Sequence, residues 1–108
     1  MELFEALEVF SSLSQETRLK VIKLLIEYGR EGVAAGKIAE QLKIPDNTLS
    51  FHLSHMSRAG LVTSKKDGRS ITYFANQSLI ENLISFLDEN CCAREIKSKN
   101  KNCKGKKC

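Results

Sequence analysis

The first ninety residues of this chain contain no cysteine, although four cysteines stand among the last eighteen. Free cysteine behaves as a small buried hydrophobe, so thiols that pack a core are expected to be scattered among apolar positions. Here they stand in or beside a lysine-rich segment that cannot form a core. The distribution indicates a ligand set appended to a folded module and favours a protein that senses a thiophilic ligand. The four cysteines are Cys91, Cys92, Cys103 and Cys108.

The chain also lacks an apolar run long enough to cross a membrane. No signal peptide is visible, because Glu2, Glu5 and Glu8 interrupt the start. We therefore expect a cytoplasmic protein without a membrane partner. In that compartment thiols stay reduced, and clustered cysteines more often bind metals or react than form structural disulfides.

No nucleophile–base pair and no site for a metal-activated water can be assembled from the residues present, so we expect that the chain is not an enzyme. A chain of 108 residues is one domain with a thin core, and a dimer that shares an apolar face is a reasonable expectation. We predict that residues 1–90 form the folded domain and that residues 91–108 form a ligand-binding tail.

The net charge of +4 is unevenly distributed. Residues 93–108 hold seven basic residues and one acidic residue, whereas residues 1–92 hold ten basic and twelve acidic residues. A nucleic-acid interaction of the folded part must therefore rest on local charge. Residues 46–75 do lean basic, with Arg58, Lys65, Lys66 and Arg69 against Asp46 and Asp67.

Hydrophobic periodicity predicts helices over about 2–13, 15–28, 34–42, 46–59 and 77–90. Ser14 and Asn76 are expected as helix N-caps. The apolar residues of the second helix surround most of its circumference and predict a buried centre. Two β-rich runs, 61–66 and 69–74, flank Asp67-Gly68 and predict a hairpin. The last helix has an apolar face wide enough to suggest a partner subunit.

This order, α-α-α-α-β-β-α, is that of a mainly α winged helix-turn-helix with a β-hairpin wing. The second helix of such a pair enters the DNA major groove. If Leu49, Leu53 and Met56 face the core, polar residues of helix 46–59 lie on or beside its exposed side, and basic residues of the wing suit phosphates or a minor groove. The predicted DNA contacts are Asn47, Thr48, Ser50, Phe51, His52, Lys65, Lys66 and Arg69.

Other interpretations of these residues stay open. The polar residues are also compatible with a merely solvated helix face, and winged helices sometimes bind proteins instead of DNA. His52 and His55, three residues apart on one helix, could act as metal ligands.

The string Thr48 to Leu53, followed by Ala59-Gly60-Leu61-Val62, Asp67-Gly68-Arg69 and Tyr73, resembles the ArsR/SmtB family of metal-sensing bacterial repressors. Residues 13–19 are also similar, and the resemblance covers about residues 5–90. Within the family, the Thr48–Leu53 string is most similar to the arsenic-responsive branch. The resemblance implies a homodimer, joined by the first and last helices, that represses an operon from double-stranded operator DNA and leaves when a ligand binds.

Neither familiar ligand site of that family is present, because residues 33–46 contain no cysteine and residues 76–92 contain no histidine. The cysteines resemble those of a smaller set of arsenic repressors with C-terminal thiols. As(III) is thiophilic and favours three sulfurs, and adjacent residues point about 100° apart on a helix. Cys91 and Cys92 therefore converge only where the helix frays. We predict Cys103 as the third ligand and Cys108 as a substitute or spectator, with As(III), or Sb(III), as inducer.

A tetrahedral zinc site of four thiolates, a thiol-redox switch and incidental cysteines remain alternatives. For release from DNA, we expect that binding of the inducer to cysteines beside a dimer helix shifts the relative positions of the two DNA-reading helices of the dimer. Withdrawal of a DNA-binding basic tail is the other possibility.

Overall fold

The structure is a computed structural model that describes residues 1–95. The predicted ligand Cys103 and its possible substitute Cys108 lie outside the described residues. The elements, in chain order, are α1 (Leu3–Leu13), α2 (Glu16–Tyr28), a 3-10 turn (Gly29–Glu31), β1 (Val33–Ala34), α3 (Ala35–Leu42), α4 (Asp46–Arg58), β2 (Val62–Asp67), β3 (Ser70–Ala75) and α5 (Gln77–Asp88). The predicted winged helix-turn-helix is confirmed.

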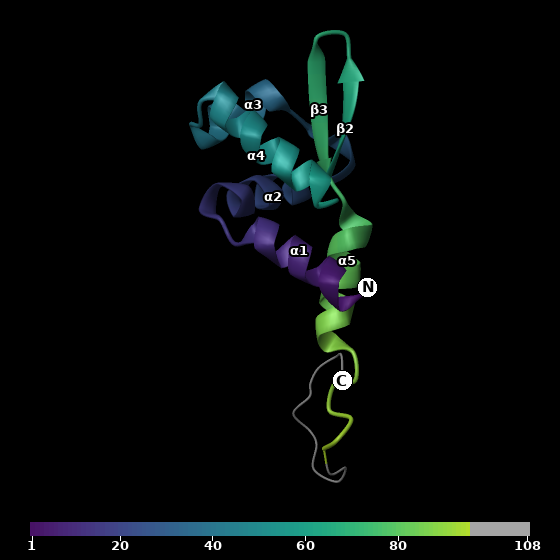
Figure 1. The fold of residues 1–108 in the computed structure, drawn as a ribbon. Helices are drawn as coiled ribbons and strands as arrows, with labels where there is room; N and C mark the ends of the chain where they lie inside the picture. Colours follow the sequence, from purple (N-terminus) through teal and green to yellow (C-terminus); the bar gives the residue numbers. More distant parts are fainter. Residues whose placement is uncertain (96–108) are drawn as a thin grey trace.

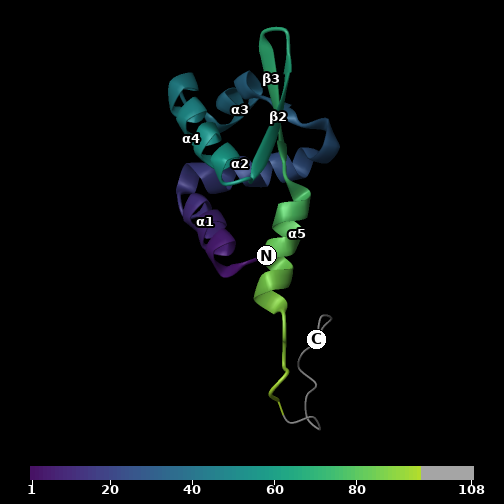
Figure 2. The ribbon, with the colours of Figure 1, turned by 45° about the vertical axis from the view of Figure 1, so that its right-hand side comes forward.

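Helix α2 crosses the middle of the molecule, with α1 on one side and the α3–α4 pair on the other (Figure 1). The β2–β3 hairpin and α5 extend from this body in opposite directions, in both Figure 1 and Figure 2. The wing and the cysteines that follow α5 therefore lie at opposite ends of the described structure.

A third strand completes the wing and was not predicted from the sequence. Strand β1 pairs with β3 through Val33↔Tyr73 and Ala34↔Thr72, which gives an antiparallel sheet of order β1-β3-β2. Two residues are too few to show a strand periodicity, so this pairing depends on the tertiary arrangement. It attaches the base of the hairpin to the segment that leads into α3.

The hairpin turn consists of Gly68 and Arg69, because Asp67 and Ser70 still pair as strand residues. Gly68 has a φ of 64°, which the left-handed region allows to glycine at little cost. Arg69 follows as the second turn residue, and its side chain is exposed. The turn therefore presents one arginine at the tip of the wing.

One of the two predicted helix caps is correct. Asn76 caps α5, since its side-chain oxygen accepts a hydrogen bond from the Leu79 amide at 3.2 Å, while its Nδ2 donates to the Gly60 carbonyl at 2.8 Å. The prediction for Ser14 was wrong, because Ser14 ends α1. Gln15 caps α2 instead, and its Oε1 accepts from the Arg18 amide at 2.9 Å.

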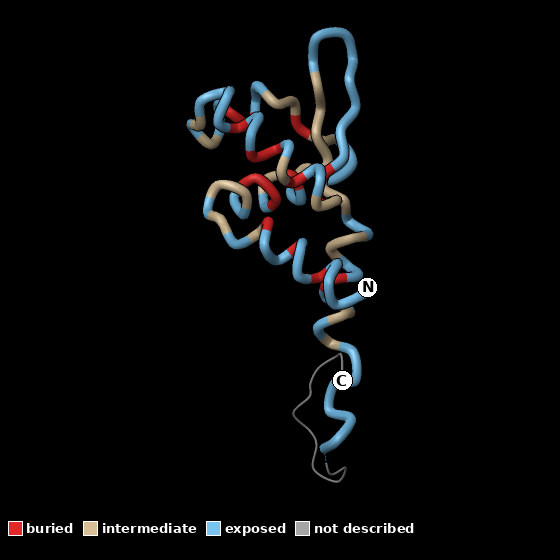
Figure 3. The backbone as a smooth tube through the Cα atoms, viewed as in Figure 1, coloured by how far each residue is buried: buried red, intermediate tan, exposed pale blue. Residues whose placement is uncertain are grey.

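The core lies where α1, α2, α3, α4 and the base of the sheet meet (Figure 3). The prediction that α2 is buried around most of its circumference was too broad, since Leu19 is 47% exposed and Ile26 is 39% exposed. Its inward residues are Val21, Ile22 and Leu25.

Helices α1 and α5 leave a set of large apolar side chains exposed. On α1 the inward residues are small, Ala6, Val9 and Ser12, so the larger apolar stripe of this helix faces outward. The exposed apolar side chains of the two helices are Leu3, Phe4, Leu7, Phe10, Ile84 and Leu87. Among residues 1–95, no helix has the length and apolar character that crossing a membrane requires.

Candidate nucleic-acid interface

The outer side of α4 carries the predicted DNA-contacting residues. Leu49, Leu53 and Met56 are at most 2% exposed and fix the inner side of the helix against the core. The consequence is that one polar surface, with one large aromatic ring, is open to solvent. Its residues are Asn47, Thr48, Ser50, Phe51 and Ser54, all of them exposed.

Phe51 is 63% exposed, although burial would stabilise a phenyl ring. Its ring meets His52 edge-on, with centroids 5.5 Å apart and an interplanar angle of 70°. An exposed ring in the first half of α4, in edge contact with His52, suits contact with a thymine methyl group in the major groove.

The structure corrects the position expected for His52. Its side chain is only 8% exposed and belongs to the inner side of α4, not to the edge of the DNA-facing surface. The reason is visible in the spacing, because Leu49, His52, Leu53 and Met56 follow the i, i+3, i+4, i+7 pattern of a single helix face. In this position the imidazole does not reach a phosphate from the exposed surface.

His52 instead bonds Arg18 of α2, with Nη1 and Nδ1 3.1 Å apart. A guanidinium only donates hydrogen bonds, so Nδ1 of His52 accepts and the ring is neutral. Burial, the Arg18 charge and His55 all lower the pKa of His52 below its ordinary value of 6.5. The neutral ring is thus the form that this site favours.

Two more residues extend this contact to α1. The Arg18 Nε donates to the Ser12 carbonyl at 2.7 Å, and the Ser12 hydroxyl lies 3.1 Å from Nδ1 of His55. Ser12 is fully buried. We call Ser12, Arg18, His52 and His55 the α4 polar network. Sequence reasoning missed it, although the i, i+3 spacing of the histidines was a usable signal for one shared face.

His52 and His55 are also the candidate metal ligands of α4. Each has Nδ1 engaged within the α4 polar network. In the part of the chain that the structure describes, no group of three or more histidine, cysteine or acidic residues is close enough to hold a metal ion.

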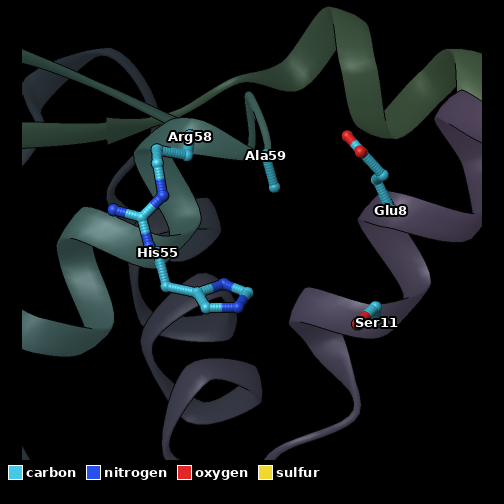
Figure 4. A pocket seen from close by; sticks show the side chains of 5 residues that line it. All are labelled: Glu8, Ser11, His55, Arg58 and Ala59. Carbon is cyan, nitrogen blue, oxygen red and sulfur yellow. The ribbon is translucent and has the colours of Figure 1, made fainter.

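Beside His55, helices α1 and α4 separate and line an open pocket of about 360 Å³. Glu8 and Ser11 contribute from α1, whereas Arg58 and Ala59 contribute from the end of α4 (Figure 4). The Ser12–His55 contact lies at the edge of this pocket, so it joins the two helices next to a region where they are not in close contact.

The basic residues of the wing lie in strand β2 and at the hairpin turn. Lys65 and Lys66 are exposed and follow each other in β2, where they pair with Thr72 and Ile71. Successive strand residues point to opposite faces of a sheet, so the two ammonium groups leave the hairpin on different sides. Arg69 projects from the turn. DNA that lies along one face of the wing would meet Arg69 and only one of the two lysines.

The chain has left the helix before the predicted metal ligands begin. Helix α5 ends at Asp88, and Asn90 and Cys92 both have a φ of 62°. The helix thus ends two residues before its predicted end at about residue 90, and the cysteine pair lies outside it, as convergence of the two side chains requires. Cys91 and Cys92 are exposed, and their Sγ atoms lie 3.3 Å apart. Cys91 is a free thiol.

Comparison with known proteins gives one consistent family. Residues 13–65 match a family model described as a helix-turn-helix domain. An uncharacterized HTH-type transcriptional regulator of Methanocaldococcus jannaschii is 37% identical over 90 residues, which cover 82% of this chain and 99% of the relative. An ArsR-like transcriptional regulator from Rhodococcus sp. RHA1 superimposes with a TM-score of 0.68 at 32% identity, over 78% of this chain and 76% of that one.

A putative arsenical resistance operon repressor of Halobacterium salinarum is 39% identical over 61 residues. That match covers 56% of this chain and 46% of the relative, so most of the relative's length lies outside it. These relatives are transcriptional regulators, in agreement with the expectation that the chain is not an enzyme.

Proposed function

The chain belongs to the ArsR/SmtB family of winged helix-turn-helix transcriptional regulators, and we propose that it is a homodimeric repressor that As(III) releases from operator DNA. The observation that carries the DNA-binding half is the single polar surface of α4, fixed by Leu49, Leu53 and Met56 and lying beside a wing with Arg69 at its tip. In this proposal Asn47, Thr48, Ser50 and Phe51 read the major groove, and wing residues contact the backbone or minor groove.

The exposed apolar side chains of α1 and α5 support a dimer through these helices. Phe4 is 79% exposed and Leu87 is 64% exposed, which is costly for a monomer in water. Two copies related by a twofold axis would bury these faces and present two α4 helices to successive major grooves, about 34–36 Å apart.

The two neighbouring sulfur atoms of Cys91 and Cys92 after α5 support a thiophilic inducer. The two Sγ atoms lie 3.3 Å apart. Two bonds from one central ion to these sulfurs, each about 2.3 Å long as in a zinc–thiolate site, would enclose an S–ion–S angle of about 90°. That angle fits a pyramidal three-sulfur ligand set better than a tetrahedron. With the thiols reduced, Cys91 and Cys92 would supply two ligands and Cys103 the third, with Sb(III) as a chemical equivalent.

The path from this site to the DNA runs along α5. Asn76 joins the start of α5 to the Gly60 carbonyl, just after the end of α4. Ligation at the far end of α5 would change the placement of this helix, and thereby the spacing of the two α4 helices in the dimer. A tenfold loss of operator affinity requires only about 1.4 kcal/mol, provided that As(III) binds the two states with different affinity.

The experiment is a fluorescence anisotropy titration of a labelled duplex, recovered by the protein from a random-sequence pool, with reductant present. Arsenite is added to the wild type, to Cys91→Ser/Cys92→Ser, to Cys103→Ser and to Cys108→Ser. We expect arsenite to release the wild type and Cys108→Ser, and to leave the other two variants bound.

The same titration with zinc, and with an oxidant after removal of reductant, tests the alternatives. Release by zinc but not by arsenite would move the function to a zinc-responsive regulator, and release by oxidant alone to a thiol-redox regulator. Failure of the wild type to select any duplex would contradict operator binding itself.

A further inference from the structure

The α4 polar network connects the helix that carries the DNA-facing surface to two other helices. Arg18 stands at its centre, because one guanidinium reaches α1 through the Ser12 carbonyl and α4 through Nδ1 of His52. A second contact, from the Ser12 hydroxyl to His55, reaches α4 one turn later. The consecutive helices α1 and α2 are thereby joined to the distant α4 by directional bonds at one part-buried point.

The apolar contacts of α4 set which side of the helix faces the core, and these bonds add a directional restraint on its rotation. Leu49, Leu53 and Met56 fill the core, but apolar packing is not directional. A hydrogen bond, by contrast, weakens steeply when its angle or length changes. His52 follows Phe51 directly, so a rotation of α4 that moves Phe51 and the neighbouring DNA-facing residues also strains the Arg18–His52 bond.

The pocket beside His55 adds to this dependence. On the side toward α1, Arg58 and Ala59 at the end of α4 border this open pocket, so direct packing against α1 does little to restrain the helix there. Beside the buried Leu53 and Met56, the polar contacts of His52 and His55 connect this stretch of α4 to α2 and α1.

We propose that Arg18 is a positioning residue for operator recognition, which fixes the orientation of α4 by bonding Ser12 and His52 at the same time. The proposal rests on the proposed operator binding. Without Arg18, the orientation of α4 above its buried apolar residues would be less tightly restrained in the free protein, and sequence-specific binding would be weakened by the fraction of molecules that leave the competent orientation. Binding to non-specific DNA, which depends on phosphate charge, would change little.

The test measures anisotropy of two labelled duplexes, one selected by the wild type and one scrambled, below the unfolding temperature of every variant. We expect Arg18→Met to lose about tenfold in affinity for the selected duplex and to bind the scrambled duplex nearly as well as the wild type. Lys20→Met is the matched control, because it removes a positive charge from the same helix at a residue whose ion pair with Glu16 is exposed.

Two conservative variants separate bonding from charge and from folding. Arg18→Lys keeps the charge but not the planar fork that serves two acceptors, so it should resemble Arg18→Met. His52→Asn keeps an acceptor close to the position of Nδ1 and should retain specific binding, whereas His52→Leu should lose it. In the His52→Leu background, Arg18→Met should have little further effect on specificity.

Three results would overturn the proposal: wild-type affinity in Arg18→Lys, an equal loss on both duplexes in Arg18→Met, or fully additive losses in the Arg18 and His52 double variant. If the wild type itself selects no duplex, the proposed operator binding fails. If it selects one and Arg18→Met binds that duplex normally, only the positioning role fails.

Discussion

The recognition helix α4 is fixed by three apolar side chains that are at most 2% exposed, whereas residues 89–95, which carry Cys91 and Cys92, are exposed throughout. Reading DNA requires several side chains to keep fixed positions on one rigid surface, so α4 must be anchored in the core. Capturing a soft ion requires only that donor atoms converge when the ion arrives, and an exposed turn beyond the end of a helix allows this. The two regions therefore should respond to mutation in different ways.

The largest effect is expected in the core beneath α4. Leu53→Ala should lower the free energy of unfolding by about 2–5 kcal/mol, because it removes buried methyl groups and leaves a cavity. Phe51→Ala, in the same helix but 63% exposed, should change stability by about 0.5 kcal/mol or less and reduce affinity for DNA instead. Urea denaturation and anisotropy measured on both variants would show the contrast. Similar losses of stability in the two variants would contradict this division of α4 into two sides.

The next largest effect concerns the tip of the wing. Arg69→Ala should reduce DNA affinity about tenfold and lower the slope of log affinity against log salt by about one unit, as expected for one lost phosphate contact. Lys65→Ala and Lys66→Ala should differ from each other, because the two side chains leave opposite faces of the hairpin. Lys23→Ala, on α2, serves as a control for charge alone. A loss of equal size in Lys23→Ala would mean that the wing makes no specific contribution.

A smaller effect on the free energy of unfolding is expected at acid pH, through protonation of His52. Its pKa is lowered in the folded state by burial, by Arg18 and by His55, so the unfolded chain binds the proton more tightly. The corresponding stability is fully present above the unfolded pKa of about 6.5 and is lost as the pH falls through the lower, folded pKa. Urea denaturation over a pH series should show a steeper acid loss for the wild type than for His52→Asn. Parallel curves for the two proteins would contradict this assignment.

The smallest effect is expected at the thiol pair in the absence of ligand. Cys91 and Cys92 are exposed and lie beyond the last helix. With reductant present, Cys91→Ser/Cys92→Ser should therefore unfold within about 0.5 kcal/mol of the wild type and bind the selected duplex with unchanged affinity. Thermal melting by circular dichroism and the anisotropy titration measure the two quantities. A large loss of stability would show that this segment is part of the fold, and would remove the contrast with α4.

Much of the fold could be predicted because its signals are local. The apolar period of 3.6 residues located each of the five α-helices found within residues 1–95, and Asp67-Gly68 located the hairpin to within one residue of its turn. Asn76 was predicted as a cap because Asn is among the residues most favoured directly before a helix, and the same rule placed the cap of α2 one residue too early, at Ser14. Strand β1 was missed because its two residues become a strand only by pairing with β3.

Part of the candidate site could also be predicted, because its signals are local as well. The exposed positions of Asn47, Thr48, Ser50 and Phe51 follow from the inward position of the leucines of α4. His52 was misplaced because a histidine looks polar in sequence, although its position in the heptad-like pattern is an inner one.

The amino-acid sequence by itself determined which segments become helices and strands and which face of α4 is polar, because these depend on neighbours within a few residues. It also determined directly where the cysteines lie along the chain. Only the tertiary structure decided that the larger apolar stripe of α1 faces outward, that His52 is buried and neutral, and that Arg18 joins α1 to α4. These depend on which surfaces meet in three dimensions. Periodicity shows which residues share a face, but not which neighbouring element covers it.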